Sequence, residues 1–305
     1  MTLSRSLMSL VVCATVAGAA SARAVEPCDN GPIACGKIAF VSARDGNPEI
    51  YSVKVGTSDA KRLTNEPQDD VDPEWSPDGK RIAFVSARGG SHEIYVMNAD
   101  GSNVVQRTFS GMYTQGPAWS PDGTKIAYTT LSNGSANLWV VGANAGGPAE
   151  TLLFEAPGWD AQPAWSPDGT QLALVSDWFA YDFVYDIFLI NADGSGFTPL
   201  TGDIFDFIDY HNPSWSPSGE RLAVGIADRT VFNDYVTTLG VMNSDGSALT
   251  PLIAAVTWST SSWSPDGQRI AYTSESGGMR NISWVKADGS AKGTIVRDGW
   301  DPSWR

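Results

Sequence analysis

Six short segments of the chain combine acidic, polar and aromatic residues, and each lies a few positions before the Trp of a repeated motif. Carboxylates bind cations, attract basic peptide segments, or act in pairs as acid and base in hydrolysis. Aromatic side chains with polar edges are frequent anchors of protein interfaces. We therefore predict that these segments form one ligand-binding surface. Its predicted residues are Asp70, Asp72, Tyr113, Gln115, Trp159, Asp160, Tyr210, His211, Trp258, Trp300 and Asp301.

Signals of catalysis are sparse. The sequence contains neither a G-x-S-x-G nucleophile motif nor an H-E-x-x-H metal motif. Histidine occurs only at His92 and His211, which excludes a histidine-rich metal site. The Asp-Gly pairs are typical of tight turns rather than of calcium loops. We expect no catalytic residue, no metal ligand and no cofactor; a divalent cation held by the carboxylates named above stays open as an alternative.

A second group of aromatic residues lies in two long loop insertions and in the segment between them. Exposed aromatic clusters of this kind commonly mark partner sites. The alternative is that these side chains pack on one another and on neighbouring elements, and the sequence favours neither reading. The predicted partner patch consists of Trp178, Phe179, Tyr181, Phe205, Phe207 and Phe232.

The motif P-x-W-S-P-D-G, followed by a short apolar run such as Ile82–Val85, recurs along the chain with small variations. The spacings between successive Trp residues of the motif are 44, 46, 50, 48 and 41 residues. This period fits the four-stranded blade of a β-propeller, which takes about 40–45 residues. The repeated residues are Trp75, Trp119, Trp165, Trp215, Trp263 and Trp304.

The sixth copy of the motif is split between the two ends of the chain. Pro302-Ser303-Trp304 ends the sequence, whereas Gly36 to Phe40 supplies the apolar run that follows Trp in the other copies. A propeller closes its ring without leaving exposed strand edges. We therefore predict an all-β fold over residues 37–305, a six-bladed β-propeller closed by a clasp between the C-terminal strand and the N-terminal blade.

The strand that contains the repeated Trp is predicted to be the innermost strand of each blade. The six acidic and aromatic segments precede these strands, so we expect them to converge on one face, around the mouth of the central channel. We call this predicted surface, made of the eleven residues named first, the channel mouth. The Pro-Asp-Gly turns open on the opposite face, where their short and repetitive sequences are typical of a scaffold.

The repeated motif, together with the later pattern I-Y-x-[MV]-N-x-D-G-S, resembles the TolB-type propeller repeat, a WD-like repeat. The resemblance covers nearly all of residues 36–305. It implies a periplasmic binding scaffold. We expect the propeller alone, without the α/β domain of TolB proper, because only residues 25–36 lie between the predicted leader and the first strand.

Residues 1–24 have the pattern of a secretory signal peptide, with Arg5, an apolar run over 7–20 and Ala22-Arg23-Ala24 before the cleavage point. The apolar run is shorter than the ~20 residues that span a membrane, so we expect no membrane span. Residues 25–36 contain Cys28 and Cys35, which we predict to form a disulfide in an oxidising compartment. The protein is therefore expected in the periplasm or the medium.

The formal net charge of −14 disfavours nucleic-acid binding and favours basic partners. From these features we expect an exported, monomeric, non-catalytic binding module that engages a protein or peptide at the channel mouth. Two alternatives stay open. One is a hydrolase that uses the mouth carboxylates with a divalent cation, and the other is a structural protein of the cell envelope.

Overall fold

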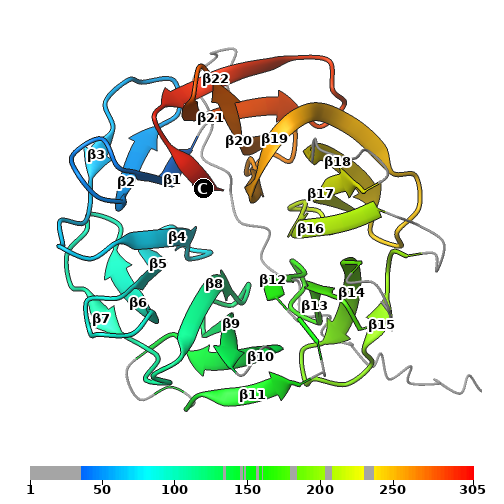
Figure 1. Cartoon of the computed structure of the whole chain (residues 1–305), viewed down its shortest axis with the longest axis horizontal. Coiled ribbons are helices and arrows are strands. Elements are labelled where there is room, and N and C mark those ends of the chain that lie inside the picture. The colour runs from blue at the N-terminus through cyan, green and yellow to red at the C-terminus, as the bar shows by residue number, and fades with distance from the viewer. Residues whose placement is uncertain are drawn as a thin grey trace, which may run out of the picture.

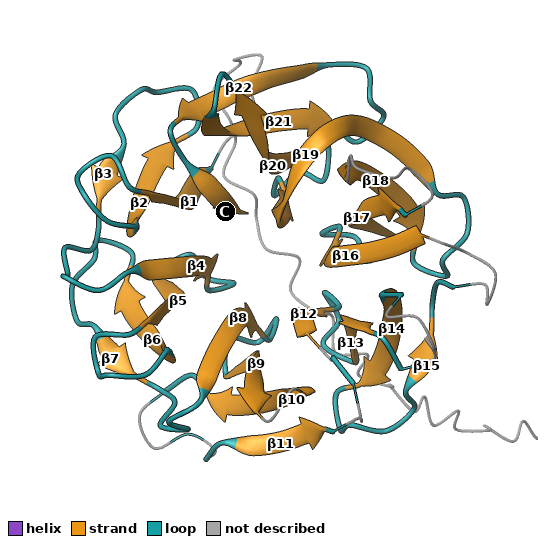
Figure 2. Ribbon diagram, in the orientation of Figure 1, coloured by secondary structure: helices purple, strands orange, loops and turns teal. Residues whose placement is uncertain are grey.

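The computed structural model describes residues 36–305 except 133–134, 145–146, 148, 156–157, 160, 179–183, 203–207 and 230–236. The predicted signal peptide, Cys28 and Cys35 lie outside the described residues. Strands, turns and loops make up the described part of the chain, as Figure 2 shows. This part contains no helix that is long and apolar enough to cross a membrane.

The strands form six blades around a central axis, which confirms the predicted all-β propeller (Figure 1). Blades one to four are four-stranded antiparallel sheets with the orders β23-β1-β2-β3, β4-β5-β6-β7, β8-β9-β10-β11 and β12-β13-β14-β15. Their strands are β1 (Lys37–Ser42), β2 (Glu49–Lys54), β3 (Lys61–Arg62), β4 (Asp70–Trp75), β5 (Arg81–Ser86), β6 (Glu93–Asn98), β7 (Val105–Gln106), β8 (Tyr113–Trp119), β9 (Lys125–Ser132), β10 (Ser135–Gly142), β11 (Thr151–Phe154), β12 (Ala161–Trp165), β13 (Gln171–Ser176), β14 (Asp186–Asn191), β15 (Thr198–Pro199) and β23 (Trp300–Trp304).

Blades five and six share one strand. β19 (Thr250–Trp263) pairs with β18 through its first part and with β20 through its last part, so it is outermost in blade five and innermost in blade six. The two blades therefore form one seven-stranded sheet. Its other strands are β16 (Ile208–Trp215), β17 (Arg221–Asp228), β18 (Thr237–Asn243), β20 (Arg269–Ser276), β21 (Met279–Lys286) and β22 (Lys292–Arg297).

Each blade is buried on both faces, because it is packed between two other blades. In β1, Ile38 and Phe40 pack against blade six, whereas Ala39 and Val41 pack against blade two. Successive side chains of a strand point to opposite faces, so a blade in a closed ring needs apolar residues at every position. This requirement explains the continuous runs such as Ile-Ala-Phe-Val after each Pro-Asp-Gly turn.

Three of the repeated Trp residues, Trp119, Trp215 and Trp263, link neighbouring innermost strands by a hydrogen bond. The indole N–H of Trp119 donates to the carbonyl oxygen of Glu74 (3.1 Å) in the preceding blade. The indole N–H of Trp263 makes the same bond to Ser214 (2.9 Å). The motif therefore both fills the space between blades and fixes their spacing.

The ring is closed as the split motif predicts. Trp304 of β23 lies opposite Ile38 of β1, and Trp300 lies opposite Val41. The main-chain N–H of Arg305 donates to the carbonyl of Lys37 (2.8 Å), which extends the pairing to the last residue. Gly36 has a φ of 119° and packs directly against the carbonyl of Arg305, which leaves no room for a side chain.

We predict that Trp304→Ala lowers the free energy of unfolding by about 3–5 kcal/mol, because it empties a buried site in the closing strand. Urea unfolding followed by tryptophan fluorescence measures this change. Met279→Ala removes an exposed side chain as the control and is expected to change stability by less than about 0.5 kcal/mol. Equal stability of the two variants would contradict this account of the clasp.

Candidate functional site

A backbone irregularity recurs at the same place in the innermost strands, three residues before the repeated Trp. There the pairing register with the second strand shifts in all six blades. In five of the blades the residue at this position has a left-handed backbone, as in a β-bulge that re-aims a side chain. These residues, with their φ angles, are Asp72 (52°), Gly116 (59°), Gln162 (58°), Asn212 (49°) and Asp301 (50°).

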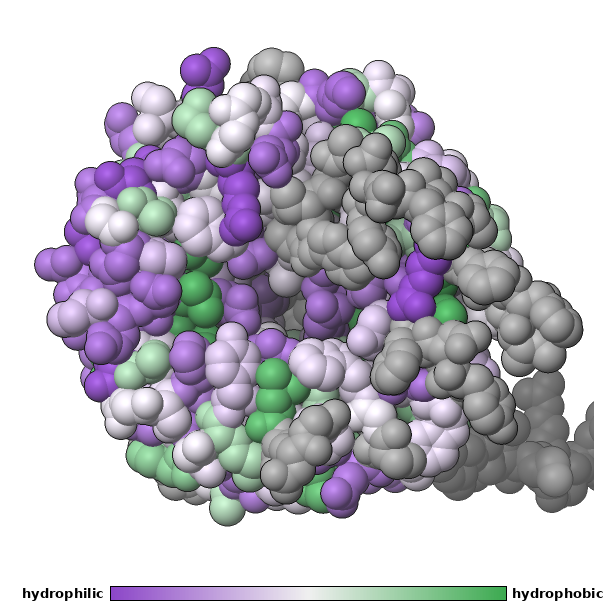
Figure 3. All heavy atoms as spheres, viewed as in Figure 1, coloured by the Kyte–Doolittle hydropathy of each residue, from purple (hydrophilic) through white to green (hydrophobic). Residues whose placement is uncertain are grey.

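The bulges form a ring around the propeller axis, and their side chains reach from one blade to the next. The carboxylate of Asp72 accepts the main-chain N–H of Gly116 (3.2 Å). The amide oxygen of Gln162 likewise accepts the N–H of Asn212 (2.8 Å). The space-filling view shows the molecule hollowed at the centre, with mostly hydrophilic residues among the coloured atoms around the hollow (Figure 3). The bulge ring therefore lines the channel with polar groups.

Two carboxyl groups of the bulge ring interact where blades one and two meet, and Glu74 contacts Ser303 of β23 between the same two blades. Asp301 on β23 and Asp72 on β4 are half-buried members of the bulge ring. Burial raises the pKa of Asp301 to about 7, and the nearby negative charge of Asp72 adds to this rise. Burial also raises the pKa of Asp72 and brings that of Glu74 to about 7. This part of the wall therefore retains protons near neutral pH.

Aromatic residues border these carboxyl groups. The ring of Tyr113 is 45% exposed and lies 4.4 Å, between centroids, from the ring of His92. Burial of its hydroxyl and the charge of Asp72 raise the pKa of Tyr113. Trp300 is half-buried, and the guanidinium of Arg280 lies 5.3 Å from its ring centroid. The structure thus brings together four of the predicted residues, Asp72, Tyr113, Trp300 and Asp301.

Three other predicted residues are buried between the blades, although the sequence analysis expects them at the exposed mouth. Asp70 and Tyr210 both occupy the fifth position before the Trp, where Thr114 is also buried. Asp70 forms a 2.7 Å ion pair with Arg88, and Tyr210 packs among apolar residues of blades four and five. His211 is 5% exposed, and burial lowers its pKa to about 4. The side chains of Asp70, Tyr210 and His211 therefore do not form part of the exposed mouth.

The remaining predicted residues are more dispersed. Gln115 is half-buried and directly precedes the bulge at Gly116. Trp159 is half-buried, and its main-chain N–H donates to Asp177 (2.7 Å). Trp178 of the predicted partner patch is 43% exposed. Outside the described residues lie Asp160, the side chain of Trp258, and Phe179, Tyr181, Phe205, Phe207 and Phe232.

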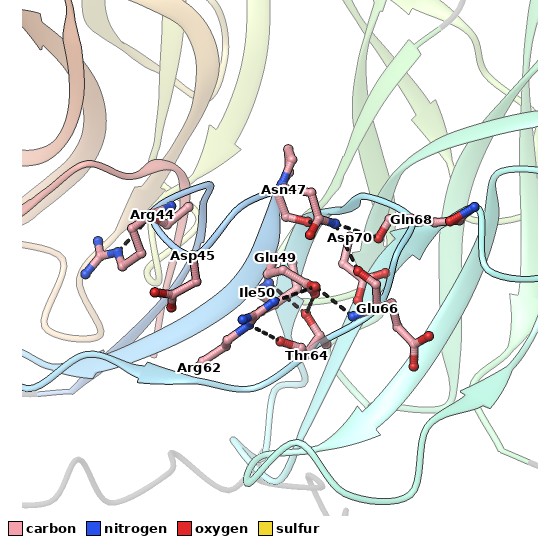
Figure 4. A network of polar contacts seen from close by, with 12 residues as sticks. Arg44, Asp45, Asn47, Glu49, Ile50, Arg62, Thr64, Glu66, Gln68 and Asp70 are labelled. Carbon is pink, nitrogen blue, oxygen red and sulfur yellow. Dashed lines mark hydrogen bonds and ion pairs between the residues drawn. The ribbon is translucent and has the colours of Figure 1, made fainter.

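Buried carboxylates outside the channel hold the loops that lead into the innermost strands (Figure 4). Glu49 accepts bonds from the guanidinium of Arg62 (2.9 Å), the hydroxyl of Thr64 (2.5 Å) and the N–H of Glu66 (2.7 Å). In blade two Glu93 takes the same place and accepts from Thr108 and from the N–H of Gly111 (2.7 Å). These two buried carboxylates share a sequence pattern, Glu-Ile-Tyr with a Thr 15 residues after the Glu. The pattern could have predicted them.

Two further features of the mouth were missed from the sequence. Glu74 alternates with Asp72 along β4, and the bulge ring itself was not expected. The bulge ring could have been predicted from the residue before the Pro of the repeated motif, since this residue is the bulge residue in blades one to five. Among the residues that the structure describes, no group of three or more His, Cys, Asp or Glu side chains is arranged to hold a metal ion.

The raised pKa of Asp301 predicts how stability depends on pH. Its carboxyl group has a pKa of about 7 when folded and about 4 when unfolded, so its contribution to stability is complete below about pH 4 and is lost as the pH rises through 7. We expect the melting temperature of the wild type to fall more steeply between about pH 5 and about pH 8 than that of Asp301→Asn. Differential scanning calorimetry across this range measures both slopes.

The control is Asp193→Asn, in an exposed turn of the opposite face. Hydrogen bonds from Ser195 lower the pKa of Asp193, so this carboxylate is ionised in both states throughout the range. The control should keep the wild-type slope. Parallel profiles for the wild type and Asp301→Asn would show that Asp301 does not hold its proton.

Comparison with known proteins identifies the family. The family model for the TolB beta propeller domain matches residues 12–130 and 113–305. No match was found among curated proteins. The structure is similar to that of TolB from Acinetobacter baumannii, with a TM-score of 0.77 and 19% identity over 88% of this chain and 66% of that one. This chain therefore spans slightly less than two thirds of that protein.

Two further solved structures show how widely the fold is used. The putative TolB from Agrobacterium tumefaciens has a TM-score of 0.63 and 21% identity over 78% of this chain and 96% of that one. An oligogalacturonate lyase in complex with manganese has a TM-score of 0.59 and 16% identity over 86% of this chain and 74% of that one. Identities this low show a shared fold rather than a shared activity. The family match over nearly the whole length carries the assignment: the chain belongs to the TolB β-propeller domain family.

Proposed function

We propose that this protein is an exported, non-catalytic binding module that takes a protein or peptide ligand at the channel mouth. The observation that supports this proposal most directly is the bulge ring. It turns polar side chains out of the packed blades and toward one central opening, where several blades can contact one object. The export is proposed from the signal peptide pattern of residues 1–24.

The charge of the mouth favours a basic segment as ligand. Burial raises the pKa values of Asp72, Glu74 and Asp301, and the negative charge of Asp72 adds to the rise at Asp301, so uncompensated negative charge is unfavourable where blades one and two meet. An entering Lys or Arg side chain would supply the opposite charge. Tyr113 and Trp300 offer aromatic area beside it, and aromatic residues are frequent binding hot spots.

The second candidate function is a hydrolase. The observation that favours it is the presence of two carboxyl groups with pKa values of about 7, Glu74 on β4 and Asp301 on β23, where blades one and two meet, since acid–base catalysts are tuned in this way. Elemental analysis of the purified protein for divalent metals tests whether such a hydrolase would use a metal ion. Stoichiometric metal in the wild type that is lost in Asp72→Asn would favour a metal-dependent hydrolase. Metal-free wild-type protein would count against a metal-dependent hydrolase.

The experiment for the binding function starts with cross-linking in the periplasm and mass spectrometry, followed by affinity measurement against the purified partner. We expect Tyr113→Ala and Trp300→Ala each to weaken binding by about 1–3 kcal/mol, because both truncate aromatic surface at the mouth. Trp159→Ala is expected to act in the same direction.

The matched control is Asp193→Asn on the opposite face, which should bind as the wild type does. Circular dichroism shows whether each variant is folded. Folded mouth variants that bind normally, together with a control that loses binding, would mean that the ligand uses the other face. Absence of any cross-linked partner would favour a purely structural protein of the cell envelope.

A further inference from the structure

Among the strands that the structure describes, the outermost strand of each blade has one edge with which no other strand pairs. Natural proteins protect such edges with charges, Pro residues or very short strands, since an open edge invites another strand to pair. Five of the six outermost strands here carry such protection. β3 consists of Lys61-Arg62, β7 has only two residues, β15 contains Pro199, β19 contains Pro251 near its start, and β22 begins with Lys292 and ends with Arg297.

β11 of blade three lacks this protection. Its four residues, Thr-Leu-Leu-Phe, include no charge, no Pro and no Gly. In Figure 1 it runs along the outer rim of the ring, away from the central channel. Its pairing with β10 shifts register at Leu153, but β19 and β22 have shifts of the same kind in their pairing with the strand inside them, so the irregularity does not set β11 apart.

Exposed apolar side chains flank this edge on both faces of the blade. Leu152 and Phe154 lie opposite Trp139 and Leu138, which are consecutive residues of β10 and therefore face opposite sides. Leu152 is 39% exposed. On the other face the ring of Phe154 lies 6.5 Å, between centroids, from that of Trp178, which is 43% exposed.

The aromatic side continues into the core. Phe154 stacks on Phe197 at 4.2 Å between ring centroids, and Phe197 stacks on the buried Phe188 at 4.5 Å. This ladder holds Phe154 in place beside the strand edge. Near the start of β11, the N–H of Phe109 donates to Glu150 (2.7 Å), and the side chain of Phe109 is 72% exposed.

The charges around β11 indicate which kind of strand it would accept. Residues 126–220 contain twelve acidic residues and not a single Lys or Arg. Glu150 directly precedes β11 and Glu155 directly follows it. A second copy of this chain would bring the same acidic segment, and antiparallel pairing of the two β11 strands would place Glu150 opposite Glu155 of the copy. A segment with basic residues at its ends complements both carboxylates.

We propose that β11 is a second binding site, at which an extended, apolar segment of a partner protein with basic residues at both ends pairs as an additional strand. The main-chain groups of β11 that point away from β10 supply the hydrogen bonds, except for the Leu153 carbonyl, which packs against Gly194. The alternating side chains of the partner pack beside Leu152 on one face and Trp178 on the other. The site is separate from the channel mouth, which the innermost strands form.

The test uses fluorescein-labelled heptapeptides of sequence Lys-Val-Thr-Val-Thr-Val-Lys and anisotropy titration of the purified protein. One comparison peptide has Glu at both ends, and another has an N-methyl group on its central Val, which removes a main-chain donor. We expect the Lys peptide to bind and both comparison peptides to bind at least about tenfold more weakly, which is about 1.4 kcal/mol.

Leu152→Lys, which adds the missing edge charge, should abolish binding of the Lys peptide. Thr294→Lys on the already protected β22 should leave it unchanged. Equal binding of the N-methylated peptide, an unaltered affinity in Leu152→Lys, or no binding of the Lys peptide would overturn the proposal. So would a dimer in sedimentation velocity that Leu152→Lys dissociates, because the occupant would then be a second copy of this chain.

Discussion

The structure depends on the packing of each blade between two others. Because both faces of every blade are buried, the strands use apolar residues at consecutive positions, and no blade is stable without its neighbours. The last strand of the chain must therefore return to the first blade, as the pairing of Trp304 with Ile38 shows. The repeated Trp residues serve the same requirement, since they are packed between blades and the indole N–H groups of Trp119, Trp215 and Trp263 bond to the preceding innermost strand.

This packing also explains where polar groups can be displayed. Regular alternation along an innermost strand sends every side chain to one neighbouring blade or the other, which is why Asp70 and Tyr210 are buried. The bulge three residues before the Trp interrupts the alternation and turns a side chain toward the axis. Asp301 occupies this position in blade one, which contains the clasp, and Asp72 occupies it in the neighbouring blade two, so these two acidic residues of the channel wall lie beside the site of closure.

The fold could be predicted well from the sequence because every blade carries the same repeated motif. Six spaced Trp residues gave the number of blades, and the split motif gave the pairing of Trp304 with the strand that contains Phe40. The mouth was predicted less completely. Asp72, Tyr113, Trp300 and Asp301 lie near one another, whereas His211 is buried, because β16 already begins at Ile208 and pairs His211 with Gly225 of β17. Glu74 was overlooked because alternation assigns it no special role. The unprotected edge of β11 emerges only when the outermost strands are known and compared.

The central claim is that the bulge ring makes the channel mouth the surface that meets a ligand. Amide hydrogen exchange, measured on the free protein and on the protein saturated with its purified partner, tests this claim most directly. The account predicts slower exchange on binding in the segments around Tyr113 to Gly116 and around Asp298 to Asp301, with no change in the Pro-Asp-Gly turns of the opposite face. Protection confined to those turns, with unchanged exchange at the mouth, would contradict it.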